Sequence, residues 1–329
     1  MPQQISIYVP KGKVSERIDT FLTHSIENAT RTKVQKAIEN GDVLIDGKIC
    51  KSSQKVVGGS IIEITLPRDP PPEISPENIP LNIVYEDENL LVINKPAPMV
   101  VHPAYGNHSG TLVNALLYKY SFFVSSEENI RPGIVHRLDK NTSGLLVVAK
   151  DNFTHSELAK QFSKHTIERE YNAIVWGVFP SKKKEGTIEA NISRSKRDRK
   201  KMTVSKTGKI AITMYSVIEE FEYFSLIKLK LKTGRTHQIR THLSHFGHPI
   251  FGDNEYGGRE ILIPNLTKKK RQEAENLLEK IHRQSLHAKV LGFLHPVKKE
   301  FMRFESELPS DFISILEALR SKKMLLIEK

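Results

Sequence analysis

Asp139 is the most unusually placed charged residue in this chain of 329 residues. It lies in the stretch 133–144, with apolar residues before it and the apolar run 145–149 after it. The polar residues and glycine at 141–144 predict a turn, because such residues bend the backbone readily. An aspartate in a loop between two buried segments can cap the turn, pair with a neighbouring arginine or lysine, or act as a catalytic carboxylate. Other parts of the chain must decide between these roles.

A second group of reactive side chains lies in the stretch 233–249, which contains two arginines and four histidines. The histidines are spaced unlike the ligands of known helical or structural zinc sites, and no cysteine lies nearby, so we expect no metal site. The planar guanidinium groups of Arg235 and Arg240 are better candidates for function. Each can pair with a carboxylate or a phosphate.

The composition favours a polyanionic partner. The formal net charge is +12 and the sequence pI is about 9.5, and such a charge is most easily offset by the phosphates of nucleic acid. No apolar run is long enough to span a membrane and no signal-peptide pattern appears at the start, so we expect a cytoplasmic protein. Cys50 is the single cysteine, which excludes a disulfide within the chain. A monomer is the default expectation.

One short segment carries most of this charge. Residues 181–210 contain eleven lysines and arginines against three acids. A flexible solvated loop is the simplest interpretation, but so much charge in one place favours an arm that contacts RNA phosphates. The residues expected to make these contacts are Arg194, Lys196, Arg197, Arg199 and Lys200.

The N-terminal part predicts a small separate domain at residues 1–66. Two short helices carry apolar stripes at 18–22 and 34–38, and a hairpin turns at Asp46-Gly47. The second helix also has a basic face, made of Arg31, Lys33 and Lys36. A basic helix face is usually only solvated, so it indicates RNA binding only when combined with other evidence.

A proline-rich segment at 67–80 separates this domain from the rest. It holds six prolines in fourteen residues, and proline cannot occupy a central strand or a helix interior, so we expect a semi-rigid linker. Residues 81–329 alternate strands with few helices, which predicts an α+β domain on mixed, mainly antiparallel sheet with flanking helices. Expected elements include strands at 168–176, 227–231, 288–294 and 301–305, and helices at 268–283 and from 310.

Four motifs together carry a family resemblance. They are Gly-Ile-Val-His-Arg-Leu-Asp-Lys-Asn-Thr-Ser-Gly at 133–144, Arg-Glu-Tyr at 169–171, Gly-Arg-Thr-His-Gln-Ile-Arg at 234–240 and Ser-Leu-His-Ala at 285–288. In this order they resemble the RluA/RluD family of RNA pseudouridine synthases. The N-terminal part resembles the αL RNA-binding domain first described in a ribosomal small-subunit protein. The resemblance covers essentially the whole chain and implies the pseudouridine synthase fold.

The resemblance implies that the protein converts uridine in structured RNA to pseudouridine without cofactor or metal. Asp139 is then the catalytic aspartate, acting on the ribose as a nucleophile or as a base on a route through a glycal. Tyr171 packs on the target base and helps to protonate the new carbon link. Arg240 pairs with the aspartate. Arg137 enters the RNA stack when the target nucleotide is flipped out.

The expected substrate is large-subunit ribosomal RNA, while transfer RNA is an open alternative and the target uridine is not determined. A second hypothesis is a non-catalytic RNA-binding factor in ribosome assembly on the same scaffold. Asp139, Tyr171 and Arg240 are all present, and a protein that only bound RNA would not need all three. A glycosidase or phosphatase is a weaker hypothesis, because no second carboxylate motif of similar context is visible.

Overall fold

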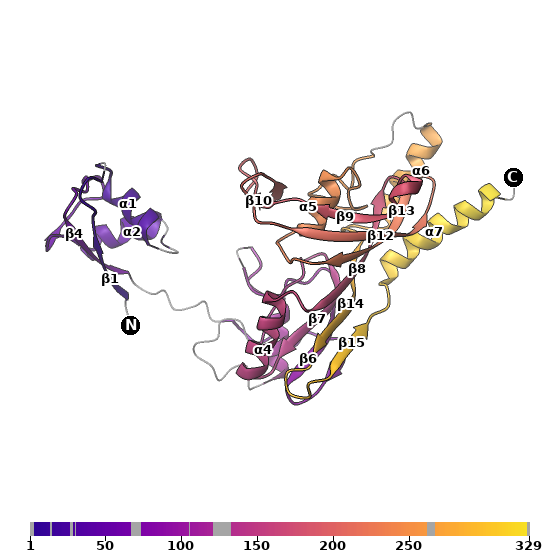
Figure 1. Ribbon diagram of the computed structural model, residues 1–329, viewed down its shortest axis with the longest axis horizontal. Helices are drawn as coiled ribbons and strands as arrows, with labels where there is room; N and C mark the ends of the chain where they lie inside the picture. The colour runs from indigo at the N-terminus through magenta and orange to yellow at the C-terminus, as the bar shows by residue number, and fades with distance from the viewer. Residues whose placement is uncertain are drawn as a thin grey trace. The chain divides into compact units, whose positions relative to one another are not determined.

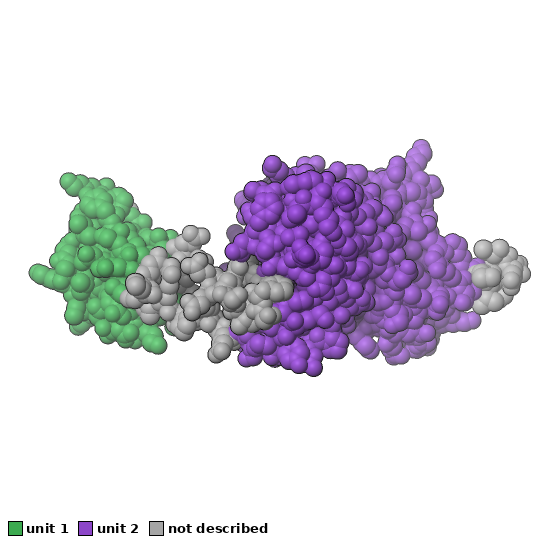
Figure 2. Space-filling view, turned by 90° about the horizontal axis from the view of Figure 1, so that it is seen from below, with its two compact units in different colours: residues 1–73 green, residues 74–329 purple. Residues whose placement is uncertain are grey.

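The computed structural model describes residues 3–13, 15–26, 29, 31–66, 74–104, 106–120, 133–261 and 267–327. The chain divides into two compact units, residues 1–73 and 74–329 (Figures 1 and 2). Residues 67–73 of the predicted linker lie outside the described residues. No helix in the described ranges is long and apolar enough to cross a membrane.

The N-terminal unit packs two helices on a four-stranded sheet of order β1-β4-β2-β3. Its elements are β1 (Gln3–Tyr8), α1 (Ile18–Ser25), α2 (Arg31–Glu39), β2 (Val43–Ile45), β3 (Lys48–Ile49) and β4 (Ile61–Leu66). The predicted apolar stripes are confirmed, since Ile18, Leu22 and Val34 are fully buried in one core. Asp46 and Gly47 have φ values of 49° and 76°, as the predicted two-residue turn requires. Strand β1 was not predicted from the sequence, because it precedes the first expected helix.

The second unit is built on one nine-stranded sheet (Figure 1). Its order is β5 (Ile83–Glu86), β6 (Leu90–Lys95), β7 (Ser143–Ala149), β14 (Leu286–Leu294), β8 (Glu168–Trp176), β13 (Phe224–Leu231), β12 (Ile212–Glu220) and β9 (Glu185–Glu189), with β15 (Phe301–Glu305) paired to β14. All pairings are antiparallel except that of β7 with β14. The predicted α+β class on mixed, mainly antiparallel sheet is confirmed.

Helices cover both faces of this sheet. They are α3 (Leu112–Lys119), α4 (Asn152–Ser163), α5 (Gln238–His245), α6 (Lys268–Glu279) and α7 (Ser310–Ile327). The unit also contains the short 3₁₀ helix η2 (Ser181–Lys183) and a small hairpin of β10 (Ile192–Arg194) and β11 (Met202–Val204). Helix α6 is shorter than the predicted helix 268–283, because the chain leaves the helix at Lys280 to bury Ile281.

Strand β8 shows how the two faces are shared. Tyr171, Ala173 and Val175 belong to the core that contains residues of α3 and α5, whereas Ile174 and Trp176 belong to the core of α6 and α7. Alternate residues of a strand point to opposite faces. Tyr171 is therefore presented on the α5 side, together with the loop that carries Asp139.

The turn expected at 141–144 needs correction. The chain turns at Lys140 and Asn141, and Ser143 already begins β7. Gly144 is required for a different reason. Its φ is +118°, and a Cβ atom there would lie 2.3 Å from the carbonyl oxygen of Ala288 on the parallel neighbour β14. Only glycine permits this close approach of two backbones.

Candidate active site

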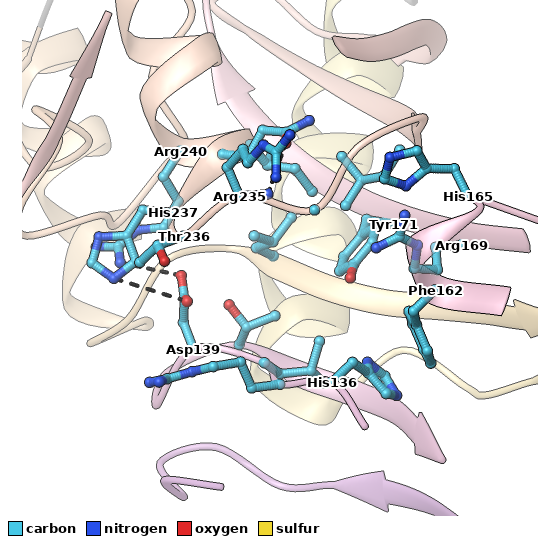
Figure 3. Close-up of a pocket in the computed structure, with 18 of the residues that line it drawn as sticks. His136, Asp139, Phe162, His165, Arg169, Tyr171, Arg235, Thr236, His237 and Arg240 are labelled. Atoms are coloured by element: carbon cyan, nitrogen blue, oxygen red, sulfur yellow. Dashed lines mark hydrogen bonds and ion pairs between the residues drawn. The ribbon is translucent and has the colours of Figure 1, made fainter. Parts of the chain in front are cut away.

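A cleft of about 580 Å³ opens on the α5 side of the sheet (Figure 3). Its lining comes from segments far apart in the sequence, at 135–142, 162–171 and 231–240, with Leu286. Among the described residues that line it, Asp139 is the one carboxylate, and four arginines also contribute to the lining. The cleft therefore combines a single acid with a strongly basic wall.

A buried lysine holds one side of the Asp139 loop. Lys95, which is fully buried at the end of β6, donates from Nζ to the carbonyl oxygens of Pro96, Met99 and Lys140 at 2.9, 2.8 and 3.3 Å. Burial lowers the pKa of Lys95 to about 7, while the charge of Asp139 acts to raise it. The lysine fixes the backbone directly after the aspartate without using its carboxylate.

Two residues just before β14 hold the other side of the loop. Arg283 donates to the carbonyl oxygen of Asn141 at 3.1 Å, and the Gln284 amide donates to the Thr142 hydroxyl at 3.1 Å. The Thr142 N–H closes the turn on the carbonyl oxygen of Asp139 at 3.0 Å. The loop is thus clamped through its backbone, and the Asp139 side chain, 21% exposed, remains directed into the cleft.

Arg240 on α5 connects Asp139 to a second, buried aspartate. Its Nη1 lies 3.4 Å from Oδ2 of Asp139, while Nε and Nη2 bind both oxygens of Asp253 at 2.7 and 2.9 Å. Nη2 also donates to Glu255 at 2.7 Å, and the guanidinium lies over the Tyr256 ring at 4.7 Å. Burial acts to lower the pKa of Arg240, but the hydrogen bonds and charges of these acids raise it above its ordinary value.

The motif analysis did not identify Asp253 as a site residue. It is 1% exposed and fixes the guanidinium of Arg240 from the side away from Asp139. The backbone N–H groups of Glu255 and Tyr256 also donate to the Asp253 carboxylate. The available signal was its position in a Gly-Asp pair shortly after the stretch 233–249.

His237 approaches the other oxygen of Asp139. Its Nε2 lies 3.9 Å from Oδ1, which is longer than a hydrogen bond (Figure 3). Its Nδ1 lies 2.8 Å from the Tyr256 hydroxyl, which already accepts a bond from the Met202 N–H at 2.8 Å. Nδ1 of His237 accepts from this hydroxyl in one tautomer and donates to it in the other. Burial lowers the pKa of His237, and Asp139 opposes this effect.

The structure brings five of the candidate residues to this cleft. Tyr171 is 8% exposed, and burial raises the pKa of its hydroxyl. Arg137 is exposed, and the ion pairs of Asp139 are with Arg240 and His237. Arg235 is half-buried and donates from Nε to the Ile210 carbonyl at 3.1 Å. With Asp139 and Arg240, these residues line one continuous surface.

The other basic candidates lie outside the cleft lining. Those at 194–200 are exposed, at the end of β10 and in its connection to β11. In the N-terminal unit, Arg31, Lys33 and Lys36 are all exposed, and Arg31 also binds the buried Asp19 through Nε and Nη2 at 3.1 and 3.0 Å. Across the described ranges, no group of three or more His, Cys, Asp or Glu residues is placed to hold a metal ion.

Two family models match the chain. The model described as RNA pseudouridylate synthase matches residues 89–245, which include the cleft residues up to Arg240, and the S4 domain model matches residues 16–62. An uncharacterized RNA pseudouridine synthase of Chlorobaculum parvum is 46% identical over 96% of this chain and 98% of the relative. The ribosomal large subunit pseudouridine synthase D of Pasteurella multocida is 40% identical over 98% of this chain and 96% of the relative.

A solved structure shows the same likeness. Human RNA pseudouridylate synthase domain containing 4 aligns with a TM-score of 0.56 and 27% identity. The alignment covers 73% of this chain and 93% of the human chain.

Proposed function

The chain belongs to the RNA pseudouridine synthase family, and from that premise we propose that it isomerises specific uridines of large-subunit ribosomal RNA with Asp139 as the catalytic residue. The observation that carries the role of Asp139 is its position as the one carboxylate among the described residues of the basic cleft. Relatives named ribosomal large subunit pseudouridine synthase D, similar over nearly the whole chain, support the choice of RNA.

The reaction breaks the bond from the ribose C1′ to N1 of uracil and makes a bond from C1′ to C5. As a nucleophile, Asp139 would bond to C1′ while the uracil leaves with the bonding electrons, and attack by C5 would then release the carboxylate. As a base, it would take the C2′ proton while the uracil leaves, and return it when C5 adds. On either route C5 then loses its proton and N1 of the uracil gains one, which completes the isomerisation. Both routes use an ionised carboxylate, whose charge Arg240 balances across 3.4 Å.

Tyr171 and Arg137 suit the two remaining tasks. The ring of Tyr171 lies on the floor of the cleft, where it can pack on the base of a flipped nucleotide. Arg137 precedes Asp139 by two residues and is exposed. It is therefore in position to fill the gap that the flipped base leaves in the RNA stack.

The basic residues outside the cleft are proposed to dock the RNA. The domain at 1–66, joined to the catalytic domain 81–329 by the linker 67–80, would provide the face of Arg31, Lys33 and Lys36. The match of residues 16–62 to the S4 domain supports this role. The exposed residues between β10 and β11, from Arg194 to Lys200, would add phosphate contacts next to the catalytic domain.

Mapping pseudouridines tests this proposal directly. Large-subunit ribosomal RNA is sequenced for pseudouridine from cells with the gene, without it, and with a copy encoding Asp139→Asn. We expect one or a few sites to disappear without the gene, return with the wild-type copy and stay absent with the variant. Unchanged large-subunit RNA together with lost sites in transfer RNA would overturn the choice of substrate.

A further inference from the structure

Arg169 is an arginine of the cleft that packing, rather than a carboxylate, holds in place. Its guanidinium lies over the Phe162 ring at 5.7 Å. On another side is Gly234, where a Cβ atom would come within 2.7 Å of Nη1. Two segments far apart in the sequence therefore leave a fitted space for this one cation.

The charge of Arg169 is not balanced within the protein. Among the described residues, none of its guanidinium nitrogens donates a hydrogen bond or joins an ion pair, and its buried Nε has no acceptor. The adjacent acids are engaged elsewhere, Glu168 with Arg303 at 3.5 Å and Glu170 with Lys230 at 2.6 Å. Burial lowers the pKa of Arg169. An enclosed cation in this state favours an anionic ligand.

The position of Arg169 relates it to the reacting nucleotide. Figure 3 shows Asp139, His237 and Arg240 at one end of the cleft and Phe162, His165 and Arg169 at the other, with Tyr171 next to Arg169. His165 is exposed and adds a second nitrogen-bearing side chain at that end. A nucleotide whose ribose meets Asp139 and whose base meets Tyr171 would leave the end of the cleft at Arg169 open to a neighbouring part of the RNA strand.

We propose that Arg169 forms a phosphate subsite, which binds a backbone phosphodiester of the RNA strand next to the flipped uridine. A guanidinium fork matches two phosphate oxygens, and such charge-assisted bonds are the strong ones. This inference rests on the proposed function for the identity of the anion. The packing of Phe162 and Gly234 orients the fork before the RNA arrives, which reduces the entropic cost of binding.

Kinetics with Arg169→Gln test the subsite. The substrate is an unmodified large-subunit ribosomal RNA transcript, and the control is Arg320→Gln, which removes an arginine of α7 that pairs with Glu219 outside the cleft lining. We expect Arg169→Gln to raise the half-saturating RNA concentration about tenfold and to reduce the salt slope of binding by about one, with the saturating rate within about threefold. Arg169→Lys should recover part of the affinity, because it restores the charge without the fork.

Identical affinity and salt slope in Arg169→Gln and Arg320→Gln would overturn the subsite, as would a loss confined to the saturating rate. If the wild-type protein made no pseudouridine in this RNA, the proposed function would fail instead.

A second measurement does not depend on turnover or on the folding of the variant. The Nε–H signal of Arg169 in the wild-type protein is followed by NMR during titration with methyl phosphate, with the Arg303 signal as the internal control. We expect a saturating shift for Arg169 and only a weak, linear change for Arg303. No shift of the Arg169 signal beyond that of Arg303 would overturn the proposal.

Discussion

Asp19 in the N-terminal unit and Asp139 in the catalytic unit share the local pattern Arg-x-Asp but end in opposite environments. Asp19 is fully buried and binds Arg17 at 3.0 Å through both oxygens, together with Arg31 and Gln35. Asp139 is 21% exposed, and within the part of the chain that the structure describes its one hydrogen bond from a side chain is the 3.4 Å contact with Arg240. Both carboxylate oxygens of Asp19 are engaged in hydrogen bonds within the N-terminal unit, whereas the carboxylate of Asp139 is partly exposed in the cleft.

The elements that carry the two residues explain the difference. Asp19 lies in the first turn of α1, and its carboxylate also accepts from the Thr20 N–H at 2.9 Å. Hydrogen bonds from Arg17 hold the pKa of Asp19 well below its usual range, and burial opposes them. Asp139 lies in a loop that is fixed largely through its backbone, and among the described residues the neighbouring Arg137 makes no ion pair with its carboxylate.

The largest difference should appear in catalysis. We expect Asp139→Asn to lower the rate of pseudouridine formation by at least about 1,000-fold, because the amide can neither attack nor take a proton. Its urea unfolding should remain close to wild type when followed by the fluorescence of Trp176, the single tryptophan of the chain. The control, Asp19→Asn, should retain the wild-type rate at saturating RNA. A rate above a tenth of wild type in Asp139→Asn would contradict the catalytic role.

The next difference concerns stability. Asp19→Ala removes several charge-assisted hydrogen bonds to a buried carboxylate, and we expect it to destabilise the N-terminal unit by about 3 kcal/mol. Cys50, the single cysteine, is 4% exposed in that unit, so its labelling by a thiol reagent reports opening there. Labelling should become about 100-fold faster or more, while Trp176 reports unchanged unfolding. Glu39→Ala, at an exposed position of α2, is the control. Equal labelling rates in the two variants would show that Asp19 contributes little.

The two aspartates also show how far the sequence could lead. Local periodicity predicted the apolar faces of α1 and α2, and the turn at Asp46-Gly47 followed from residue types alone. The same local information could not separate Arg17, which binds Asp19, from Arg137, which lies exposed next to Asp139. That distinction depends on which distant residues the fold brings close.

The residues that the sequence did not reveal act through such distant contacts. Asp253 matters because it binds Arg240, and Arg169 stands out because no carboxylate pairs with it among the described residues. Strand β1 was missed for a similar reason, since its pairing with β4 joins the two ends of the N-terminal unit. Pairing partners and unpaired charges are properties of the folded chain, and a single sequence carries little local signal for them.

Acid should affect the two units at different pH. His287 is 1% exposed, and burial, with the charges of Arg283 and Lys289, lowers its pKa to about 4. Below about pH 6.5 position 287 binds a proton in the unfolded chain but not in the folded chain, so His287 should cost the catalytic unit about 2 kcal/mol between pH 7 and 5. Burial also lowers the pKa of His136, to about 3, and this adds to the loss. The lowered pKa of Asp19 gives stability that is complete above about pH 3.9 and is lost only below it.

Urea unfolding at pH 7 and 5 measures this difference, with Trp176 as the reporter for the catalytic unit. Cys50 labelling with a dithiodipyridine, which reacts with thiols in acid, reports the N-terminal unit. We expect the midpoint from Trp176 to fall and that from Cys50 to change little. In His287→Gln the fall should be smaller, and an unchanged fall would remove His287 as its cause.

The smallest difference separates two basic residues of α2. Arg31 is expected to contact RNA although it also binds Asp19, whereas Lys36 is exposed. We expect Arg31→Gln and Lys36→Gln each to weaken RNA binding about threefold and to lower its salt slope. Only Arg31→Gln should speed Cys50 labelling, by about tenfold, because only it removes hydrogen bonds from a buried carboxylate. Unchanged RNA affinity in Arg31→Gln would assign Arg31 to the fold alone. In that case the fixed arginine pairs of the N-terminal unit would serve stability, and its RNA contacts would come from the lysines that the fold leaves exposed.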